Sequence, residues 1–238
     1  MALKTCLAMV VTMNYFSMAQ VALRSLRINS GLDIPCRVFC TDKDNSLAID
    51  GRVNELRALY NDLTIHKVDT LKYEQHNKKW PGYWSHEMFN IKGYDRVIFS
   101  DADVICMGSL EDLPTTDLGM IFETPRKQFF AGFISVGKKY LNAETYDAIL
   151  KHQKLPGTWG RDQAVYNEYF DKDEITELHR KYTTVTNAKC DDIRMLHYIF
   201  KPDQQSRLSP EYRELWAAHT LAVDEELRNA GYKTTNGG

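Results

Sequence analysis

Apolar, strand-like runs alternate with helical patterns through the first hundred residues, and this alternation restricts the fold more than any other feature. The apolar runs are residues 5–12, 36–41, 64–68 and 96–100. Between them, apolar residues at helical spacing predict helices over 17–31 and 53–63. Strands that alternate with helices favour a largely parallel sheet covered by helices. The sequence therefore predicts the α/β class.

Several helix ends carry sequence signals. Ser17 and Gln20 have the spacing of a capping box, and Gly31 supplies a C-terminal stop. A Ser-Pro-Glu start predicts a long helix over 209–229, which either packs on the domain or pairs with a second copy as a homodimer. Further strands are expected over 118–122, 130–136, 182–186 and 195–200. Further helices are expected over 85–91, over 143–152 with Asn142 as its cap, and over 161–170.

Composition narrows the class of protein. A chain of 238 residues, 43% of them hydrophobic, can bury one sizeable core, so we expect a single domain over 1–230 and a flexible tail over 231–238. The net charge of −2 provides no overall basic field, which argues against nucleic acid as a partner. The apolar run Cys6–Val11 is too short for a transmembrane segment or a signal peptide. Five scattered cysteines are typical of reduced proteins, so a cytoplasmic location is predicted.

Two carboxylates stand where a buried strand is predicted to end. Asp101 and Asp103 follow the hydrophobic run Val97–Phe99. Side chains at i and i+2 of an extended segment share a face, so both carboxylates can bind one hard divalent cation. The alternative is a solvent-exposed turn that only terminates the strand. In open α/β sheets this edge is where ligands bind.

A histidine and a lysine in a later apolar run extend this interpretation. His197 is a candidate third metal ligand, and an imidazole would favour manganese over magnesium or calcium. A hydrogen-bonded core histidine is the alternative. Lys201 offers a point charge suited to a phosphate oxygen, or it is an ordinary surface lysine.

Four blocks of sequence, taken together and in this order, resemble the pattern of a known family. They are TMNYFSMAQVALRSL, YDRVIFSDADVICMGSLEDL, FFAGFISV followed by WGRDQAVYNEYF, and LHYIFKP. Together they resemble the family 8 glycosyltransferases. The resemblance implies a GT-A fold, a single Rossmann-like domain with a mostly parallel mixed central sheet flanked by helices. In it, residues 1–105 would form the nucleotide-binding half and residues 106–205 the donor and acceptor half.

The resemblance also implies an activity. It indicates a metal-dependent, retaining glycosyltransferase that moves a hexose from a UDP-sugar, with UDP-glucose or UDP-galactose favoured, to a carbohydrate or protein acceptor. The implied cofactor is Mn²⁺, with Mg²⁺ as an alternative. A non-catalytic relative that binds nucleotide or carbohydrate on the same fold is the second reading. A phosphatase of the haloacid dehalogenase type would carry its aspartates after the first strand, and here they come at residue 101.

Matched motif by motif, the resemblance assigns candidate roles. Asp101, Asp103 and His197 would bind the metal, and Asp162 and Gln163 would lie beside the transferred sugar as the catalytic pair. The other nucleotide- and donor-binding candidates are Thr12, Met13, Asn14 and Tyr15, which would hold the uridine, Lys79 or its neighbour Lys78, Ser85, Ala102, Ala131, Gly132 and Lys201.

Two positions and one segment depart from the family pattern; the segment is 198–203 after His197, which is shortened and lacks the family's glycine. Ser85 stands where the family commonly has a lysine, and Phe130 replaces an asparagine that typically touches the sugar. Both changes leave the donor sugar open. Four aromatic residues are expected either to line an acceptor groove or to be buried in the core. They are Trp80, Tyr83, Trp84 and Trp159.

Overall fold

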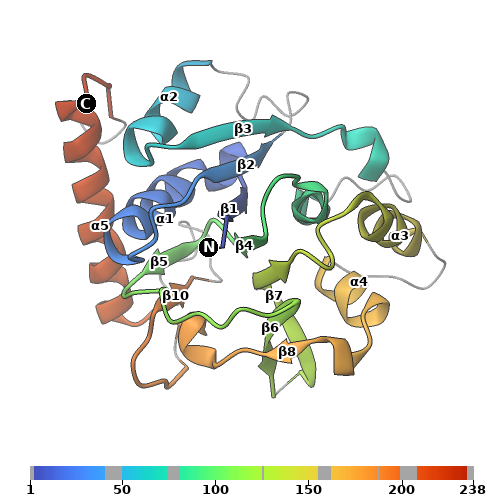
Figure 1. Cartoon of the computed structure of the whole chain (residues 1–238). Coiled ribbons are helices and arrows are strands. Elements are labelled where there is room, and N and C mark those ends of the chain that lie inside the picture. Colours follow the sequence, from blue (N-terminus) through green and yellow to red (C-terminus); the bar gives the residue numbers. More distant parts are fainter. Residues whose placement is uncertain are drawn as a thin grey trace.

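The computed structural model describes residues 3–40, 50–73, 81–124, 126–154, 162–186, 188–198 and 208–234 (Figure 1). Its centre is a seven-stranded sheet with the order β3-β2-β1-β4-β7-β6-β8. A second sheet of three strands has the order β5-β10-β9. Helices cover the large sheet on both faces, which confirms the predicted mixed α/β class.

The first half of the chain forms the parallel part of the large sheet. Its four strands pair in parallel. They are β1 (Thr5–Val10), β2 (Cys36–Cys40), β3 (Leu63–Lys67) and β4 (Arg96–Ser100). The helix α1 (Phe16–Asn29) follows β1 and stops before Gly31, whose φ of 70° suits a residue without a Cβ, and α2 (Asp50–Leu59) follows β2. The carboxyl ends of β1 and β4 consequently lie at one edge of the sheet.

The second half adds an antiparallel strand. β7 (Gln128–Gly137) runs antiparallel to both of its neighbours, β4 and β6 (Leu118–Glu123). The short strand β8 (Thr176–Glu177) pairs in parallel with β6. The order places β7 next to β4, so the middle of β7 lies beside the carboxyl end of β4.

The small sheet joins segments that are distant in the sequence. β5 (Val104–Cys106) pairs antiparallel with β10 (Met195–His197), and β10 pairs in parallel with β9 (Thr184–Val185). Because β5 begins directly after Asp103, this pairing brings His197 to the Asp-Ala-Asp segment.

The two faces of the large sheet have separate cores. On one face, Leu7 and Met9 of β1 pack with residues of α1 and α2. On the other, Cys6 and Ala8 pack with residues of η3 (Pro81–Asn90), α3 (Ala143–Gln153) and α4 (Asp162–Tyr169). This alternation is what a strand covered on both faces requires. The remaining 3₁₀ turns are η1 (Met13–Tyr15), η2 (Thr70–Tyr73), η4 (Lys172–Glu174) and η5 (Arg180–Tyr182).

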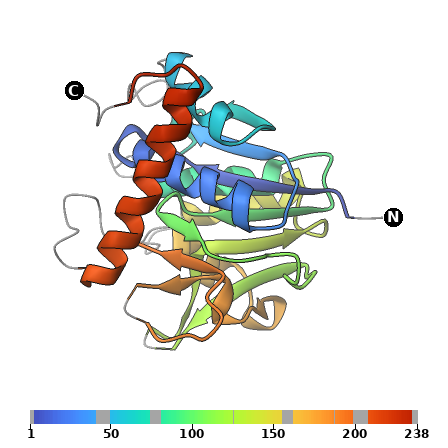
Figure 2. The same ribbon diagram turned by 90° about the vertical axis from the view of Figure 1, so that its left-hand side faces the viewer.

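The long helix α5 (Pro210–Asn229) lies across α1, as Figure 2 shows. Its buried residues Trp216, Val223 and Leu227 join a third hydrophobic cluster with residues of α1 and α2. Glu226 of α5 forms ion pairs with Arg24, at 2.9 Å, and with Arg27 of α1. Of the two predicted arrangements, the structure therefore shows packing on the same chain. No helix in the described part is long and apolar enough to cross a membrane.

Some local predictions were wrong at element boundaries. The capping box at Ser17 is absent because α1 begins at Phe16, which puts Ser17 inside the first turn, and no side chain caps this helix. The second helix ends at Leu59 instead of continuing to Leu63, which enters β3. The helix expected over 85–91 is instead a 3₁₀ segment that starts at Pro81.

Candidate metal and substrate site

The Asp-Ala-Asp segment is held by backbone hydrogen bonds from two directions. Asp101 follows β4, and its N–H donates to the carbonyl of Gly132 in β7 at 2.9 Å. The Asp103 carbonyl accepts from the N–H of Tyr198, directly after β10, at 2.7 Å. The segment is thus fixed by β7 on one side and β10 on the other, which holds both carboxylates at the edge of the sheet.

Asp101, Asp103 and His197 form a compact cluster. The Nε2 atom of His197 lies 3.0 Å from Asp103 Oδ1 and 3.7 Å from Asp101 Oδ2. One ligand atom from each residue lies within 4.8 Å of the others. His197 is 5% exposed and Asp101 38%, so one side of the cluster is closed and the other is open. Two carboxylates and one imidazole suit a divalent cation.

The electrostatics of the cluster fit the same interpretation. Burial, and after it the negative charges of Asp103 and Asp162, raise the pKa of Asp101 to about 7, against the opposing effect of His197. Burial alone would lower the pKa of His197, but Asp103, Asp101 and Glu123 together raise it to about 9. The cluster therefore concentrates negative charge, which a bound cation would neutralise.

Gly132 and Phe130 of β7 shape the space around Asp101. A Cβ on Gly132 would stand 2.3 Å from Cζ of Phe130 and 2.6 Å from Oδ2 of Asp101. Only glycine leaves room for both groups. The Phe130 ring also packs against the His197 ring, with a centroid distance of 5.1 Å. Phe130 is consequently a wall of the cluster, a role that the sequence did not reveal.

Asp162 reaches the same edge from the first turn of α4. Its Oδ2 accepts a hydrogen bond from Ser85 Oγ at 3.2 Å, and its charge acts on Asp101. Ser85 Oγ lies 2.6 Å from the hydroxyl of Tyr166, which lies 2.7 Å from Nδ1 of His86. Ser85, Tyr166 and His86 therefore form a buried chain of polar groups that ends at Asp162. The sequence comparison identified Ser85 only as a lost lysine, since pairing between η3 and α4 has no local sequence signal.

Gln163 ties α4 to β7. Its Oε1 accepts from the N–H of Ala131 at 3.3 Å. One turn later, Asn167 forms two hydrogen bonds of 2.7 Å with the backbone of Phe129. Two side chains at i and i+4 thus hold the strand that carries Gly132.

The candidate uridine residues follow β1 at the same edge as the metal cluster. Thr12, Met13 and Tyr15 are half-buried and Asn14 is exposed. Tyr15 and Met13 pack beside the core cluster on the α1 face. The other donor candidates Lys78, Lys79 and Lys201 lie outside the described residues, as do Trp80 and Trp159. Tyr83 and Trp84, which are 7% and 2% exposed, are buried in the core, the second of the two predicted alternatives.

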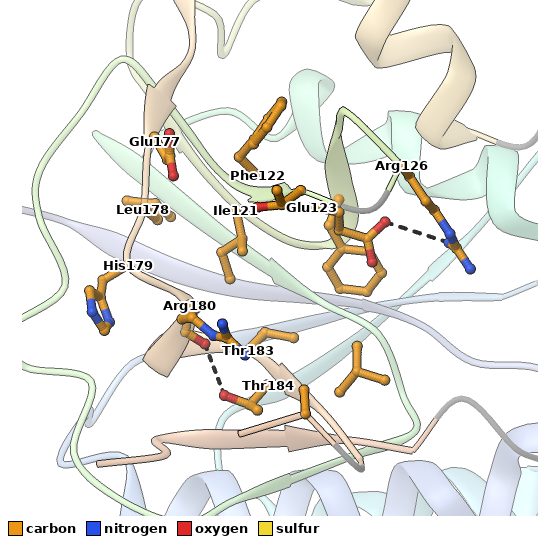
Figure 3. A pocket seen from close by; sticks show the side chains of 14 residues that line it. Ile121, Phe122, Glu123, Arg126, Glu177, Leu178, His179, Arg180, Thr183 and Thr184 are labelled. Atoms are coloured by element: carbon orange, nitrogen blue, oxygen red, sulfur yellow. Dashed lines mark hydrogen bonds and ion pairs between the residues drawn. The ribbon is translucent and has the colours of Figure 1, made fainter. Parts of the chain in front are cut away.

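A cleft of about 650 Å³ opens beside the cluster (Figure 3). Its walls come from β6, from the turn that follows β6, from the segment 177–180 and from β9. Glu123 and Arg126, whose Oε2 and Nη1 atoms lie 3.5 Å apart, occupy one side. His179, Arg180 and Thr184 occupy the other side. Phe130 also lines the cleft, so it borders both the cleft and the metal cluster.

This strand order and ligand cluster define a class of fold, the GT-A fold of glycosyltransferases. The solved structure of galactosyltransferase LgtC, in complex with donor and acceptor sugar analogues, has a TM-score of 0.71 at 15% identity. The match covers 94% of this chain and 99% of the LgtC chain. Bifunctional glycosyltransferase WbbM, in its apo form, has a TM-score of 0.71 at 13% identity and covers 95% of this chain. Apo GlyE of Streptococcus pneumoniae TIGR4 has a TM-score of 0.71 at 19% identity and covers 98% of this chain.

The family follows from the sequence itself. Residues 6–146 match the model of Glycosyl transferase family 8, so the chain belongs to this family. It spans 52% of the WbbM chain and 66% of the GlyE chain. No curated protein matches the sequence. At identities of 13% to 19%, the likeness to solved structures concerns the fold alone.

Proposed function

We propose that the protein is a metal-dependent, retaining glycosyltransferase that moves a hexose from a UDP-sugar to a carbohydrate or protein acceptor. The observation that carries this proposal is the cluster of Asp101, Asp103 and His197 at the carboxyl edge of the sheet in a member of family 8. UDP-glucose and UDP-galactose are the favoured donors. A cytoplasmic location and a homodimer remain predictions.

The proposed cation is Mn²⁺, with Mg²⁺ as the alternative. The mixed set of two carboxylates and one imidazole favours manganese over calcium or magnesium. When bound, such a cation neutralises the charge that develops on the β-phosphate as the bond to the sugar breaks. The cluster residues fit such a cation. Among the described residues, no lysine or arginine forms an ion pair with Asp101 or Asp103, so the negative charge of these carboxylates is available to a cation.

The residues around the cluster suit the other parts of a nucleotide sugar. Thr12 to Tyr15 follow the strand β1, which runs parallel to β4, and they are the proposed uridine site. The exposed side of Asp101 then faces the diphosphate. Lys79 and Lys201 are proposed additional contacts to phosphate oxygens.

Asp162 is proposed to stabilise the reacting sugar. The bond from the anomeric carbon to the β-phosphate oxygen breaks, and its electron pair stays on UDP. The acceptor oxygen forms the new bond to the same carbon, and its proton passes to solvent. Positive charge develops on the anomeric carbon in between, and the Asp162 carboxylate, oriented by Ser85, would stabilise that charge. Gln163 would keep α4 and β7 at a fixed distance around the sugar.

Calorimetric titration of UDP tests the proposal. Wild-type protein should bind UDP with Mn²⁺ and lose this binding with EDTA or after Asp103→Ala. Asp95→Ala is the matched control, because Asp95 precedes the same strand at its opposite end and contacts Lys4 and Lys138 instead. Release of UDP from a panel of UDP-sugars then identifies the donor. Absence of UDP binding with Mn²⁺ would refute the proposal.

A non-catalytic relative is the second candidate, favoured by the changes at Ser85 and Phe130. It predicts manganese-dependent UDP binding with no release of UDP from any donor, with or without added saccharides. The same titration and donor panel therefore separate the two candidates.

A further inference from the structure

The small sheet has two different faces. Leu196 and Ile105, which are register partners in β10 and β5, belong to the third hydrophobic cluster together with buried residues of α5. His197 follows Leu196, and neighbouring side chains of a strand point to opposite faces. One face of the small sheet therefore carries the candidate metal ligand. The other face packs against α5, which passes beside β5 and β10 (Figure 1).

Tyr198 connects the metal cluster to α5. It directly follows His197, and its N–H donates to the carbonyl of Asp103 at 2.7 Å. Its ring packs edge-on against the ring of Trp216 in α5, with a centroid distance of 4.7 Å. Its hydroxyl donates to the carbonyl of Tyr212, also in α5, at 3.0 Å. The backbone of Tyr198 is thus attached to two candidate metal ligands, and its side chain is attached to α5.

This connection is tight on both sides. The Tyr198 side chain is 1% exposed, so its ring has no free space in which to swing away from α5. Among the described residues, its aromatic contacts and its hydroxyl bond are all made with α5. A displacement of α5 would consequently shift Tyr198, and with it the backbone that holds Asp103 and His197 at their distance of 3.0 Å. Groups that orient metal ligands in this way influence the affinity for the metal.

We infer that Tyr198 is a positioning residue, which couples the docking of α5 on the domain to the geometry of the metal site. The inference rests on the proposed function for the identity of the metal, whereas the coupling itself is measured without turnover. Coupling between two equilibria is reciprocal. If docked α5 strengthens the binding of Mn²⁺, bound Mn²⁺ must strengthen the docking of α5 by the same factor.

Manganese affinity, taken from the signal of free Mn²⁺ in electron paramagnetic resonance, is the first measurement. Tyr198→Phe keeps the ring and loses the hydroxyl bond to α5, so the affinity should fall about two- to tenfold, the effect of one neutral hydrogen bond. Trp216→Phe, a change confined to α5, should also weaken binding because the smaller ring packs less tightly on Tyr198.

Tyr60→Phe provides the comparison for Tyr198→Phe. The hydroxyl of Tyr60 donates to the carbonyl of Ile34 at 2.8 Å, before the start of β2 and therefore at the edge of the sheet opposite the metal cluster. Both variants lose one tyrosine hydroxyl bond to a backbone carbonyl, so a general loss of stability affects both. Tyr60→Phe should bind Mn²⁺ as wild type.

Hydrogen exchange followed by mass spectrometry measures the reciprocal effect. In the wild type, peptides from the first half of α5 should exchange at least about twofold more slowly with Mn²⁺ than with EDTA, because opening of α5 then disturbs an occupied site. This protection should decrease in Tyr198→Phe. Peptides from α3, on the other face of the large sheet, should exchange equally in both conditions.

The outcomes separate this inference from the proposed function. Manganese binding with wild-type affinity in Tyr198→Phe or Trp216→Phe, or exchange in α5 that is indifferent to Mn²⁺, would overturn the inference alone. A wild-type protein that binds no Mn²⁺ would refute the proposed metal dependence and the inference together.

Discussion

Nε2 of His197 lies 3.0 Å from Oδ1 of Asp103, although 94 residues separate them in the sequence. The antiparallel pairing of β5 with β10 sets this distance, because His197 is the register partner of Val104. The third candidate ligand is therefore positioned by strand pairing instead of by a flexible loop. In the described residues, Nδ1 of His197 has no hydrogen-bond partner, so the contact through Nε2 is what orients the ring.

The first prediction concerns this histidine. His197→Gln should weaken Mn²⁺ binding at least about tenfold, because it replaces a nitrogen ligand on a fixed strand. The signal of free Mn²⁺ in electron paramagnetic resonance measures this directly. His219→Gln on α5, a histidine that is not part of the cluster and whose charged neighbour is Arg24 of α1, should bind manganese as wild type. Equal affinity in both variants would remove His197 from the metal site.

The second prediction concerns the space at Gly132. Gly132→Ala should displace Phe130 or Asp101, and we expect destabilisation of about 1–3 kcal/mol together with weaker Mn²⁺ binding. Adding Phe130→Leu should restore part of both losses by making room. Gly108→Ala is the control, since its nearest contact is the flexible Arg194 side chain at 3.2 Å. Urea unfolding and manganese titration are compared for the wild type, Gly132→Ala, the double variant and Gly108→Ala. Unchanged stability and unchanged manganese binding in Gly132→Ala would contradict the prediction.

The third prediction concerns the polar chain behind Asp162. Tyr166→Phe removes the hydroxyl that lies between Ser85 and His86, and Tyr146→Phe removes a similarly buried hydroxyl that donates to Glu87 at 2.8 Å. Both variants should lose about 1–3 kcal/mol of stability, because each removes a hydrogen bond between buried groups.

Only Tyr166→Phe should lower the rate of UDP release from the donor, with UDP binding retained. The Tyr166 hydroxyl contacts Ser85, which donates to Asp162, whereas the Tyr146 hydroxyl contacts Glu87 and Tyr73. Steady-state kinetics separate kcat from KM for the two variants. Equal rates in Tyr166→Phe and Tyr146→Phe would show that the hydroxyl is structural only.

The fourth prediction is a pH dependence of stability. Complete burial lowers the pKa of His86 from 6.5 to about 3, so the folded chain keeps it neutral where the unfolded chain takes up a proton. Its contribution is complete above pH 6.5 and declines as pH falls toward 3, by up to about 1.4 kcal/mol per pH unit.

Urea unfolding at several pH values below 6.5 measures this slope. The slope should become shallower in His86→Gln and stay as wild type in His179→Gln, at an exposed position. An unchanged slope in His86→Gln would assign the acid sensitivity to other groups.

Local sequence patterns predicted the parts of the fold that local physics determines. β4 runs from Arg96 to Ser100 as predicted, because a compact apolar run ends at a pair of aspartates. Asn142 caps α3 by accepting from the N–H of Thr145 at 2.8 Å, also as predicted. The Asp-Ala-Asp segment and His197 were expected to meet, and the structure brings them together.

Contacts between segments that are distant in the chain could not be predicted from the sequence. The strand β5 has only three residues and no turn signal of its own, and it forms because β10, which also pairs with β9, pairs with it. The contact between Ser85 and Asp162 joins residues 77 positions apart, and no periodicity indicates it. Tyr83 and Trp84 are aromatic residues of the kind that line sugar grooves, but tertiary packing buries them in the core.

The strand β10 also sets the order in which the site can be completed during synthesis. The ribosome delivers the chain from its N-terminus, so Asp101 and Asp103 emerge well before His197. A nascent chain that ends before β10 holds two neighbouring carboxylates without the imidazole that faces them in the finished molecule. The full set of three candidate ligands is therefore assembled late in translation, and products that terminate before His197 lack it.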